Sequence, residues 1–366
     1  MEKTLVTIGQ RMAVRCGGMI VLLLGIWTGC MPTDSGNGMS NNNDNGSTEA
    51  RWQLVLNELP AALLSVSGTS PSDVYAVGAD PGDGRGPFVL RYDGTNWRRL
   101  NTSATGDLWW ISEKPVNNSF YFAGEEGLIL RFDTATESFE RQTTPGTELI
   151  FGVWAADADT VWAVGGNFEN PDAGGVIWRF DGSQWTQEDL STIAPGGPPT
   201  LFKVWGRSKS EVYAVGFAGI ILRFDGTTWS QIPSPTTRRL FTVHGNDTET
   251  VAVGGFLDSV ILEQLDGAFV ERAAPLTPQM NGVFIPPNGN GVVVGIEAAV
   301  AFQTTTGWEV QNTGLASQTT RDFHSVWVDP SGGIWAVGGN VISDPLNDGI
   351  LAQFGVSDVG TLIVNP

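Results

Sequence analysis

The sequence contains almost no cysteine and almost no histidine. Its two cysteines, Cys16 and Cys30, both precede residue 51, so the rest of the chain can form no disulfide and no cysteine-ligated zinc site. Its two histidines, His244 and His324, are not accompanied by a His, Asp and Glu cluster at the spacing of metal ligands. We therefore expect both histidines to be structural, and we expect no metal and no other cofactor.

Basic residues are also scarce, with 20 Lys and Arg against 39 Asp and Glu, a formal net charge of −19 and a pI near 4.3. Such a chain lacks the basic surface that nucleic-acid binding requires. The sequence has no glycine-rich phosphate loop, no nucleophile elbow and no long 3.6-residue period. These absences predict a protein that is not an enzyme and does not bind nucleic acid.

What the sequence does contain is a repeat. A valine in one apolar run precedes a glycine after the next run by twelve residues in five copies, and variants one residue shorter or longer give two more. The seven copies are Val66–Gly78, Ile111–Gly124, Val153–Gly165, Val204–Gly216, Val243–Gly254, Val283–Gly295 and Val326–Gly338. Repetition at a period of roughly forty residues is the sequence signature of a repeat architecture.

Each repeat reads as four short strands. In the clearest copy, residues 202–205, 212–215 and 220–224 form largely apolar runs, and Trp229 opens a fourth run after the turn Asp225-Gly226. Sheets of four strands repeated radially form a β-propeller. The sequence therefore predicts an all-β fold, a seven-bladed β-propeller of four-stranded blades over residues 51–366.

The two ends of this region differ in strand content. Residues 51–58 carry the fourth-strand pattern that the last repeat lacks after residues 350–354. We expect this N-terminal strand to complete the seventh blade, because closing the ring removes free sheet edges. The alternative is that residues 361–364 take that place or add a further strand.

The turn between the third and fourth strands contains an aspartate in five repeats. Asp-Gly between apolar runs is typical of a hairpin, because the carboxylate accepts from nearby backbone N–H groups and glycine adopts positive φ. We interpret these carboxylates as structural rather than as a catalytic or metal-binding ring. They are Asp93, Asp133, Asp181, Asp225 and Asp266.

The whole unit, Val-Tyr/Trp-Ala-Val-Gly followed by Arg-x-Asp-Gly-x-x-Trp, resembles known propellers. Its turns resemble the Asp-box of sialidase-type propellers, although they have one residue fewer between Asp and Trp and lack the usual preceding Ser. The unit also resembles photosystem-II assembly-factor-like propellers and tectonin repeats. The resemblance covers about residues 51–355 and implies the fold, which hosts enzymes, lectins and scaffolds alike.

Residues 1–29 resemble a bacterial lipoprotein signal peptide. Three basic residues precede an apolar stretch at 17–27, which is shorter than the roughly 20 residues that span a membrane. The junction Thr28-Gly29-Cys30 resembles a lipobox, with Trp27 where that family usually has Leu. The alternative is an ordinary secretory signal with an incidental cysteine.

Residues 30–50 then read as a lipidated Cys30 followed by a polar tether rich in Asn and Ser. A diacylglyceryl-type group plus an acyl chain would attach the protein stably to a membrane. We expect an exported monomer in the bacterial cell envelope, at the outer membrane or cell surface, that contacts the membrane through its lipid anchor alone.

Extra sequence lies between the second and third strands at 79–87, 166–175 and 339–349, and before the fourth repeat at 189–200. In a propeller these loops share one face, which we predict to bind an unknown protein or glycan. Candidate contacts in the loops are Asp80, Asp83, Arg85, Glu169, Asp172, Asp344 and Asp348. Candidates near the channel mouth are Arg238, Arg239, Arg321 and His324.

The leading hypothesis is thus a non-catalytic interaction scaffold, and two alternatives remain. Trp154, Trp205 and Trp327 share one innermost-strand position, which we interpret as packing between blades, whereas a sugar-binding platform would indicate a lectin. A hydrolase or lyase would use the four channel-mouth candidates. Sialidase-like catalysis would also need a tyrosine nucleophile, and none of the four tyrosines is placed as one: Tyr75, Tyr92, Tyr121 and Tyr213.

Overall fold

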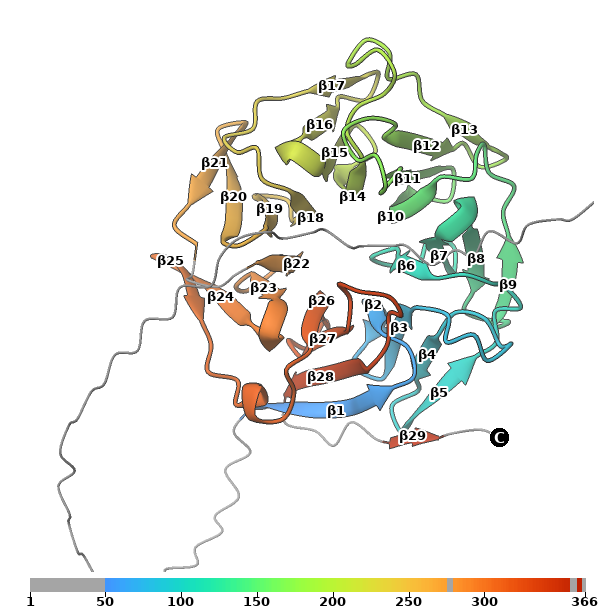
Figure 1. Ribbon diagram of the computed structural model, residues 1–366, viewed down its shortest axis with the longest axis vertical. Coiled ribbons are helices and arrows are strands. Elements are labelled where there is room, and N and C mark those ends of the chain that lie inside the picture. Colours follow the sequence, from blue (N-terminus) through green and yellow to red (C-terminus); the bar gives the residue numbers. More distant parts are fainter. Residues whose placement is uncertain (1–49, 275–278, 356–360, 364–366) are drawn as a thin grey trace, which may run out of the picture.

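The computed structural model describes residues 50–274, 279–355 and 361–363, which form a ring of seven antiparallel sheets around a central axis (Figure 1). Every blade has four antiparallel strands, so the predicted all-β, seven-bladed propeller is confirmed. The predicted signal peptide, Cys30 and the tether to residue 49 lie outside the described residues.

The first four blades follow the chain. Blade one contains β2 (Leu63–Ser70), β3 (Asp73–Gly78), β4 (Val89–Tyr92) and β5 (Asn96–Leu100). Blade two contains β6 (Leu108–Ile111), β7 (Ser119–Gly124), β8 (Ile129–Asp133) and β9 (Ser138–Arg141). Blade three contains β10 (Leu149–Asp157), β11 (Thr160–Gly166), β12 (Val176–Phe180) and β13 (Trp185–Gln187). Blade four contains β14 (Leu201–Ser208), β15 (Glu211–Gly216), β16 (Ile221–Phe224) and β17 (Trp229–Gln231).

The remaining blades complete the ring. Blade five contains β18 (Leu240–Gly245), β19 (Thr250–Gly255), β20 (Ser259–Leu265) and β21 (Ala268–Arg272). Blade six contains β22 (Met280–Phe284), β23 (Val292–Gly295), β24 (Val300–Thr304) and β25 (Gly307–Val310). Blade seven contains β26 (Asp322–Val328), β27 (Ile334–Gly339) and β28 (Gly349–Gly355), with β1 (Arg51–Leu59) as its outermost strand. Short 3-10 turns occur at η1 (Glu125–Gly127), η2 (Phe217–Gly219), η3 (Ile296–Ala298) and η4 (Leu315–Ser317).

The N-terminal strand closes the ring, as predicted. β1 pairs antiparallel with β28 from Arg51↔Gly355 to Leu59↔Gly349. The Trp52 ring packs against Phe354 at 5.6 Å and Phe323 at 6.4 Å between centroids. The C-terminal strand β29 (Thr361–Ile363) does not compete for that edge, because it pairs parallel with β5 as a fifth strand of blade one.

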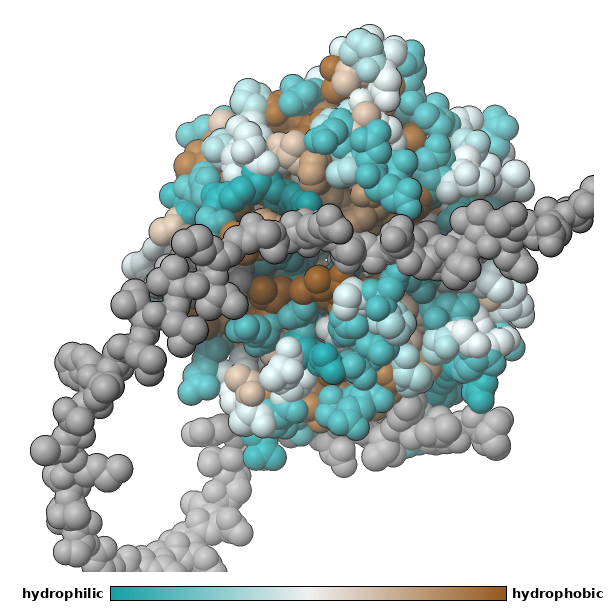
Figure 2. Space-filling model, viewed as in Figure 1, coloured by the Kyte–Doolittle hydropathy of each residue, from teal (hydrophilic) through white to brown (hydrophobic). Residues whose placement is uncertain are grey.

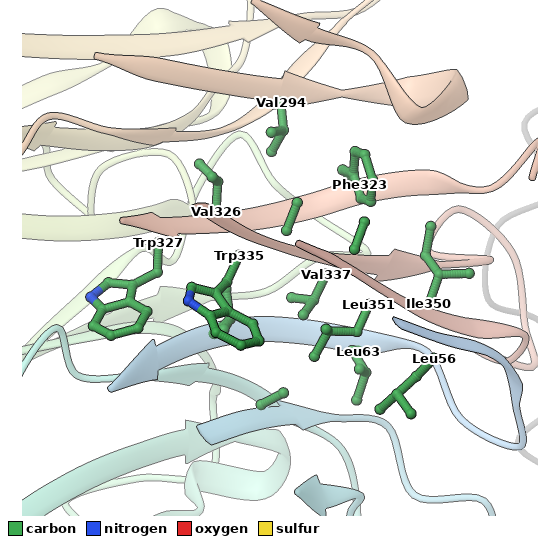
Figure 3. Packing of buried hydrophobic residues seen from close by; sticks show 14 of the residues in the cluster. Leu56, Leu63, Val294, Phe323, Val326, Trp327, Trp335, Val337, Ile350 and Leu351 are labelled. Atoms are coloured by element: carbon green, nitrogen blue, oxygen red, sulfur yellow. The ribbon is translucent and has the colours of Figure 1, made fainter. Parts of the chain in front are cut away.

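The hydrophobic core lies between neighbouring blades, because both faces of each sheet are covered. Figure 3 shows this at the closure, where Trp335, Val337 and Leu351 of blade seven pack with Leu63 of blade one. Trp335 and Trp97 are 1% and 0% exposed, and their rings meet edge to face at 5.9 Å. The alternating apolar residues of each strand therefore pack against the neighbouring blade on either side of the sheet.

The turn aspartates cap the hairpins between third and fourth strands. Asp93, Asp133, Asp181 and Asp225 each accept two backbone N–H bonds of 2.8–2.9 Å through Oδ1. These bonds lower the pKa of each carboxyl below its usual range, because they favour the ionised form. Asp266 differs: it adopts φ 49 before Gly267 at φ 84, a turn with two positive-φ residues.

Every innermost strand carries an irregularity at the same place. The pairing register shifts once near the start of β2, β6, β10, β14, β18, β22 and β26. The residue inside each shift is Leu64, Trp109, Phe151, Phe202, Phe241, Asn281 or His324. A bulge of this kind bends the strand and redirects the side chains that follow it toward the channel.

Candidate functional site

The ring has two faces, which we name for their loops. The insertion face carries residues 79–87, 166–175, 189–200 and 339–349, and Figures 1 and 2 look onto it. Figure 2 shows hydrophobic residues near the centre of this face and hydrophilic residues around them. The hairpin face, on the far side, carries the turns between the first and second strands. A pocket with several charged side chains in its lining opens on the hairpin face.

This hairpin-face pocket has a volume of about 600 Å³. Its lining comes from blades two to six, including Glu113, Trp154, Trp205, Arg207 and Asp247. It narrows toward the axis into a second cavity of about 40 Å³, the axial well, with which it shares Glu113, Trp154 and Trp205. The site is therefore a wide vestibule leading to a narrow well on the propeller axis.

Aromatic rings wall the entrance of the well. Trp154, Trp205 and Trp327 are only 4–6% exposed, because each indole lies against a glycine of the following blade. A Cβ on Gly206, Gly245 or Gly68 would come within 2.6–2.8 Å of the indole that covers it. The interpretation of these tryptophans as inter-blade packing is confirmed. The same packing makes the well a rigid structure.

The inner wall of the well is aliphatic. One branched side chain from each blade faces it, namely Val66, Ile111, Val153, Val204, Val243, Val283 and Val326. These are the first-strand residues of the seven repeats. An apolar wall lowers the local dielectric, so charged groups at either end interact more strongly than they would in water.

Two serines interrupt the aromatic ring. Ser67 and Ser112 occupy the position that is aromatic in the other five blades, and Glu113 follows Ser112 into the space they leave. The Ser67 hydroxyl donates a 2.5 Å hydrogen bond to the Glu113 backbone carbonyl. The Glu113 side chain is 30% exposed. Blade two thus contributes a carboxylate where blades three to seven contribute rings.

His244 faces this carboxylate from blade five. Its Nδ1 accepts a 3.0 Å hydrogen bond from the Ile285 backbone N–H, which places the hydrogen of the neutral ring on Nε2. Nε2 lies 3.7 Å from Glu113 Oε2 and has no hydrogen-bond partner among the described residues. The ring is stacked on Phe284 at 4.3 Å, so its direction is fixed.

Glu113 is held in its charged form. Burial acts to raise the pKa of this carboxyl, but His244, Lys114 and a hydrogen bond from the Trp205 side chain act in the opposite direction. Together they hold the pKa of Glu113 below its usual range, so the group is ionised at neutral pH. The mouth of the well is therefore a fixed negative site.

A different pair, Trp110 and Lys203, lines the same well at the end nearer the insertion face. Trp110 and Lys203 stand at the position just before the aliphatic wall, where the other blades have Ser65, Gly152, Thr242, Gly282 and Ser325. The Lys203 Nζ donates a 2.8 Å hydrogen bond to the Phe151 carbonyl and lies 4.1 Å from the centre of the Trp110 ring. Burial lowers the pKa of Lys203 to about 7.

His324, a predicted site residue, belongs to this inner layer rather than to an open surface. Its Nδ1 donates a 2.5 Å hydrogen bond to the Leu64 carbonyl of the next blade. Burial, followed by the nearby Lys203 charge, lowers the pKa of His324 to about 3. Asn281 makes a similar link, because its Nδ2 donates a 2.8 Å bond to the Phe323 carbonyl. These side chains connect adjacent blades around the axis.

The other predicted arginines lie on the insertion face in separate contacts. Arg238 pairs with Asp258 and Glu271, and Arg321 pairs with Asp348 at 2.7 Å. Arg239 lies over the rings of Phe217 and Phe256, at 4.9 and 5.4 Å from their centres, and burial lowers its pKa. The structure brings Arg321 and Asp348 together, but the arginines do not converge on one point.

The loop carboxylates on the insertion face divide into two groups. Asp83 pairs with Arg99 and contacts Arg85 at 4.0 Å, whereas Glu169 and Asp172 are exposed loop residues. Asp80 accepts from the Gly106 backbone N–H and, with Glu125 and Asp344, acts on Asp107. Burial first, and then these like charges, raise the pKa of Asp107 to about 6.

Sequence reasoning did not identify Glu113, Lys203 or Trp110 as site residues. Each departs from what its repeats otherwise place at that point of the inner strand or just after it. That departure was the available signal, because a side chain unlike its six equivalents disrupts packing unless it has another role. Among the described residues, no three His, Cys, Asp or Glu side chains gather as metal ligands.

Comparisons with known proteins support the fold. No family model and no curated protein matches the chain. Among solved structures, YCF48 from Cyanidioschyzon merolae is 15% identical with a TM-score of 0.59, over 84% of this chain and 99% of that one. The structure of YCF48 bound to D1 peptide is 15% identical with a TM-score of 0.59, over 86% of this chain and 100% of that one. The WD40 propeller domain of Doa1 is 12% identical with a TM-score of 0.59, over 85% of this chain and 98% of that one. At these identities the likeness shows the propeller fold alone.

Proposed function

We propose that this protein is a non-catalytic scaffold that binds a protein partner through the hairpin-face pocket. The observation that carries the proposal is the rigid pocket itself, in which a fixed carboxylate stands among indoles locked onto neighbouring blades. Preformed concave sites are typical of specific binding. A propeller of the same fold, YCF48, has been solved with a peptide bound, which supports a protein partner.

The geometry favours binding over proton transfer. A general base must offer a free lone pair to the reacting group. The Nδ1 lone pair of His244 is already taken by the Ile285 N–H, and its Nε2 hydrogen faces Glu113. The Ser67 hydroxyl donates to a backbone carbonyl rather than to a base. Neither His244 nor Ser67 is therefore poised for proton transfer, and we propose that Glu113 acts as a fixed charge that attracts a partner.

The lectin alternative is less well supported. Sugar binding needs an exposed aromatic face, yet the three equivalent tryptophans are 4–6% exposed and cover neighbouring glycines. A protein side chain that enters from the vestibule needs no such face. We therefore keep the lectin as an outcome to be tested.

We also propose that the propeller is exported and anchored to a bacterial envelope through Cys30, on the evidence of the lipobox-like junction in the sequence. No helix among the described residues is long and apolar enough to cross a membrane. The Cys30→Ser variant should lose acylation and leave the membrane fraction, as measured by fractionation and mass spectrometry. A wild-type protein that is soluble and unmodified at Cys30 would contradict the anchor.

The binding proposal is tested by site-specific photo-cross-linking in the native envelope. A photo-reactive residue at Asp247, on the pocket, should cross-link one protein reproducibly, whereas the same residue at Glu169, on the insertion face, should not. Cross-links from Glu169 alone would place the binding face where the sequence predicted it. Binding in a glycan array, without protein cross-links, would establish the lectin instead.

A further inference from the structure

We propose that the axial well receives a lysine or arginine side chain of the protein partner, which pairs with Glu113. This inference rests on the proposed function and specifies its chemistry. Three observations carry it: an ionised carboxylate with incomplete partners, an imidazole N–H that faces this carboxylate at 3.7 Å, and a vestibule that leads to the carboxylate while Lys203 lies at the far end of the well.

The first observation is the incomplete satisfaction of Glu113. An ionised carboxylate can accept about four hydrogen bonds. His244 Nε2 lies 3.7 Å from Glu113 Oε2, beyond the roughly 3.2 Å limit of a direct N–H···O bond. A carboxylate at the edge of an apolar well costs free energy unless further donors reach it. An ammonium or guanidinium group supplies several donors together with the opposite charge.

The second observation is the position of the His244 Nε2–H beside Glu113. The imidazole side chain is 9% exposed, and its nitrogen points at Glu113 from the opposite side of the well. Because the Ile285 bond and the Phe284 stack hold the ring, it cannot turn elsewhere. The Nε2–H dipole therefore fixes one side of the carboxylate. The other side remains open to the vestibule.

The third observation is the fit of a basic side chain. The well holds about 40 Å³, enough for a few water-sized groups, and the vestibule of about 600 Å³ accommodates the aliphatic stem and flanking residues. A net charge of −19 attracts a basic partner from a distance. An acidic side chain would meet Glu113 and be repelled.

The test is a selection of random peptides on the full-length protein held in detergent micelles, in parallel with Glu113→Gln. The wild-type protein should enrich peptides that share one lysine or arginine. Changing that residue to glutamine should weaken binding to the wild type at least about tenfold. The same change should have little effect on binding to Glu113→Gln, because the charge it recognises is already absent.

Two further variants make the result specific. Glu309→Gln removes an exposed carboxylate on β25. It should not change the affinity for the enriched basic peptide or for its glutamine-substituted version. Glu113→Asp keeps the charge but withdraws it by one methylene, so it should bind the basic peptide with intermediate affinity. If Glu113→Gln fails to fold, as judged by its melting curve, the Glu113→Asp comparison decides the question.

The remaining outcomes separate this inference from the proposed function. Enriched peptides without a basic residue, or with affinity unchanged in Glu113→Gln, would overturn the inference and leave protein binding standing. Failure to enrich any peptide would count against both. Saturation of the wild type by a neutral sugar, abolished by Glu113→Gln, would replace both with the lectin.

Discussion

The two ends of the propeller channel are built from the same seven strands, yet they differ in kind. Near the insertion face, Trp110 and Lys203 occupy the axis, and the lysine bonds to the Phe151 carbonyl. Near the hairpin face, Glu113 stands at the mouth of an open well. One end contains a buried lysine that is hydrogen-bonded to a backbone carbonyl of the same chain, whereas the other contains an ionised carboxylate with few hydrogen-bond donors.

The difference comes from a few departures from the repeat. Large residues replace small ones at Trp110 and Lys203, and small residues replace aromatic ones at Ser67 and Ser112. The first exchange fills the channel, and the second admits Glu113. Because each of these first-strand positions occurs once in every blade, a departure in two of the seven blades is enough to determine which side chains lie at that end of the channel.

The largest effect is expected from opening the ring, because this change would disrupt both ends of the channel. Deleting residues 51–58 removes nearly all of β1 and with it the outer edge of blade seven. Trp52 and Leu56 are buried there, and each contributes about 2 kcal/mol by burial alone. Together with the lost strand pairing, this should lower the melting temperature by at least roughly 10 °C, measured by calorimetry.

The matched control deletes residues 31–49, which precede β1. This shorter chain should melt at the wild-type temperature. A protein that begins at Leu59 and melts unchanged would show that β1 does not hold the ring closed.

The fold could be predicted from the sequence because its signals are local and repeated. The valine-to-glycine spacing, the Asp-Gly turns and the missing strand at the C-terminal end each report on backbone pairing between neighbours. The strand β29 was left open among alternatives, because three residues carry too little pattern to select an edge.

The site was harder to predict, because it depends on contacts across the axis. Glu113 and His244 belong to blades two and five and are 131 positions apart in the sequence, yet they lie 3.7 Å apart. Loop length led the prediction to the insertion face, whereas the pocket depends on inner-strand side chains at the opposite end. The insertion-face candidates remain a prediction, since their contacts neither establish nor exclude binding.

The next largest effect is on the pH dependence of folding stability, through the buried side chain of Lys203. The pKa of Lys203 is about 7 in the folded protein and 10.5 in the unfolded chain. Between these values the unfolded chain holds one more proton, so stability rises with pH. Below pH 7 the burial penalty is fully present, at most about 5 kcal/mol from about 1.4 kcal/mol per pH unit.

Lys203→Met keeps the packing on Trp110 and removes this titration. In urea unfolding, the variant should be more stable than the wild type at pH 6, and its advantage should shrink or reverse by pH 9.5 because the Phe151 carbonyl loses its donor. Lys209→Met, at a side chain 68% exposed, is the control and should show no such trend. A pH-independent difference for Lys203→Met would contradict a titrating lysine in the channel.

The smallest effect is expected at the hairpin face, where packing rather than charge is changed. In Gly206→Val, the new Cβ would lie 2.6 Å from the Trp154 indole, so the ring must move. Overpacking of this kind costs about 1–3 kcal/mol, and it should also abolish binding at the pocket that Trp154 lines. In a Trp154→Leu background the same valine should cost less, because the smaller side chain leaves room for it. Equal costs in the two backgrounds, measured by chemical unfolding, would mean that the contact between Trp154 and Gly206 does not set the shape of the well.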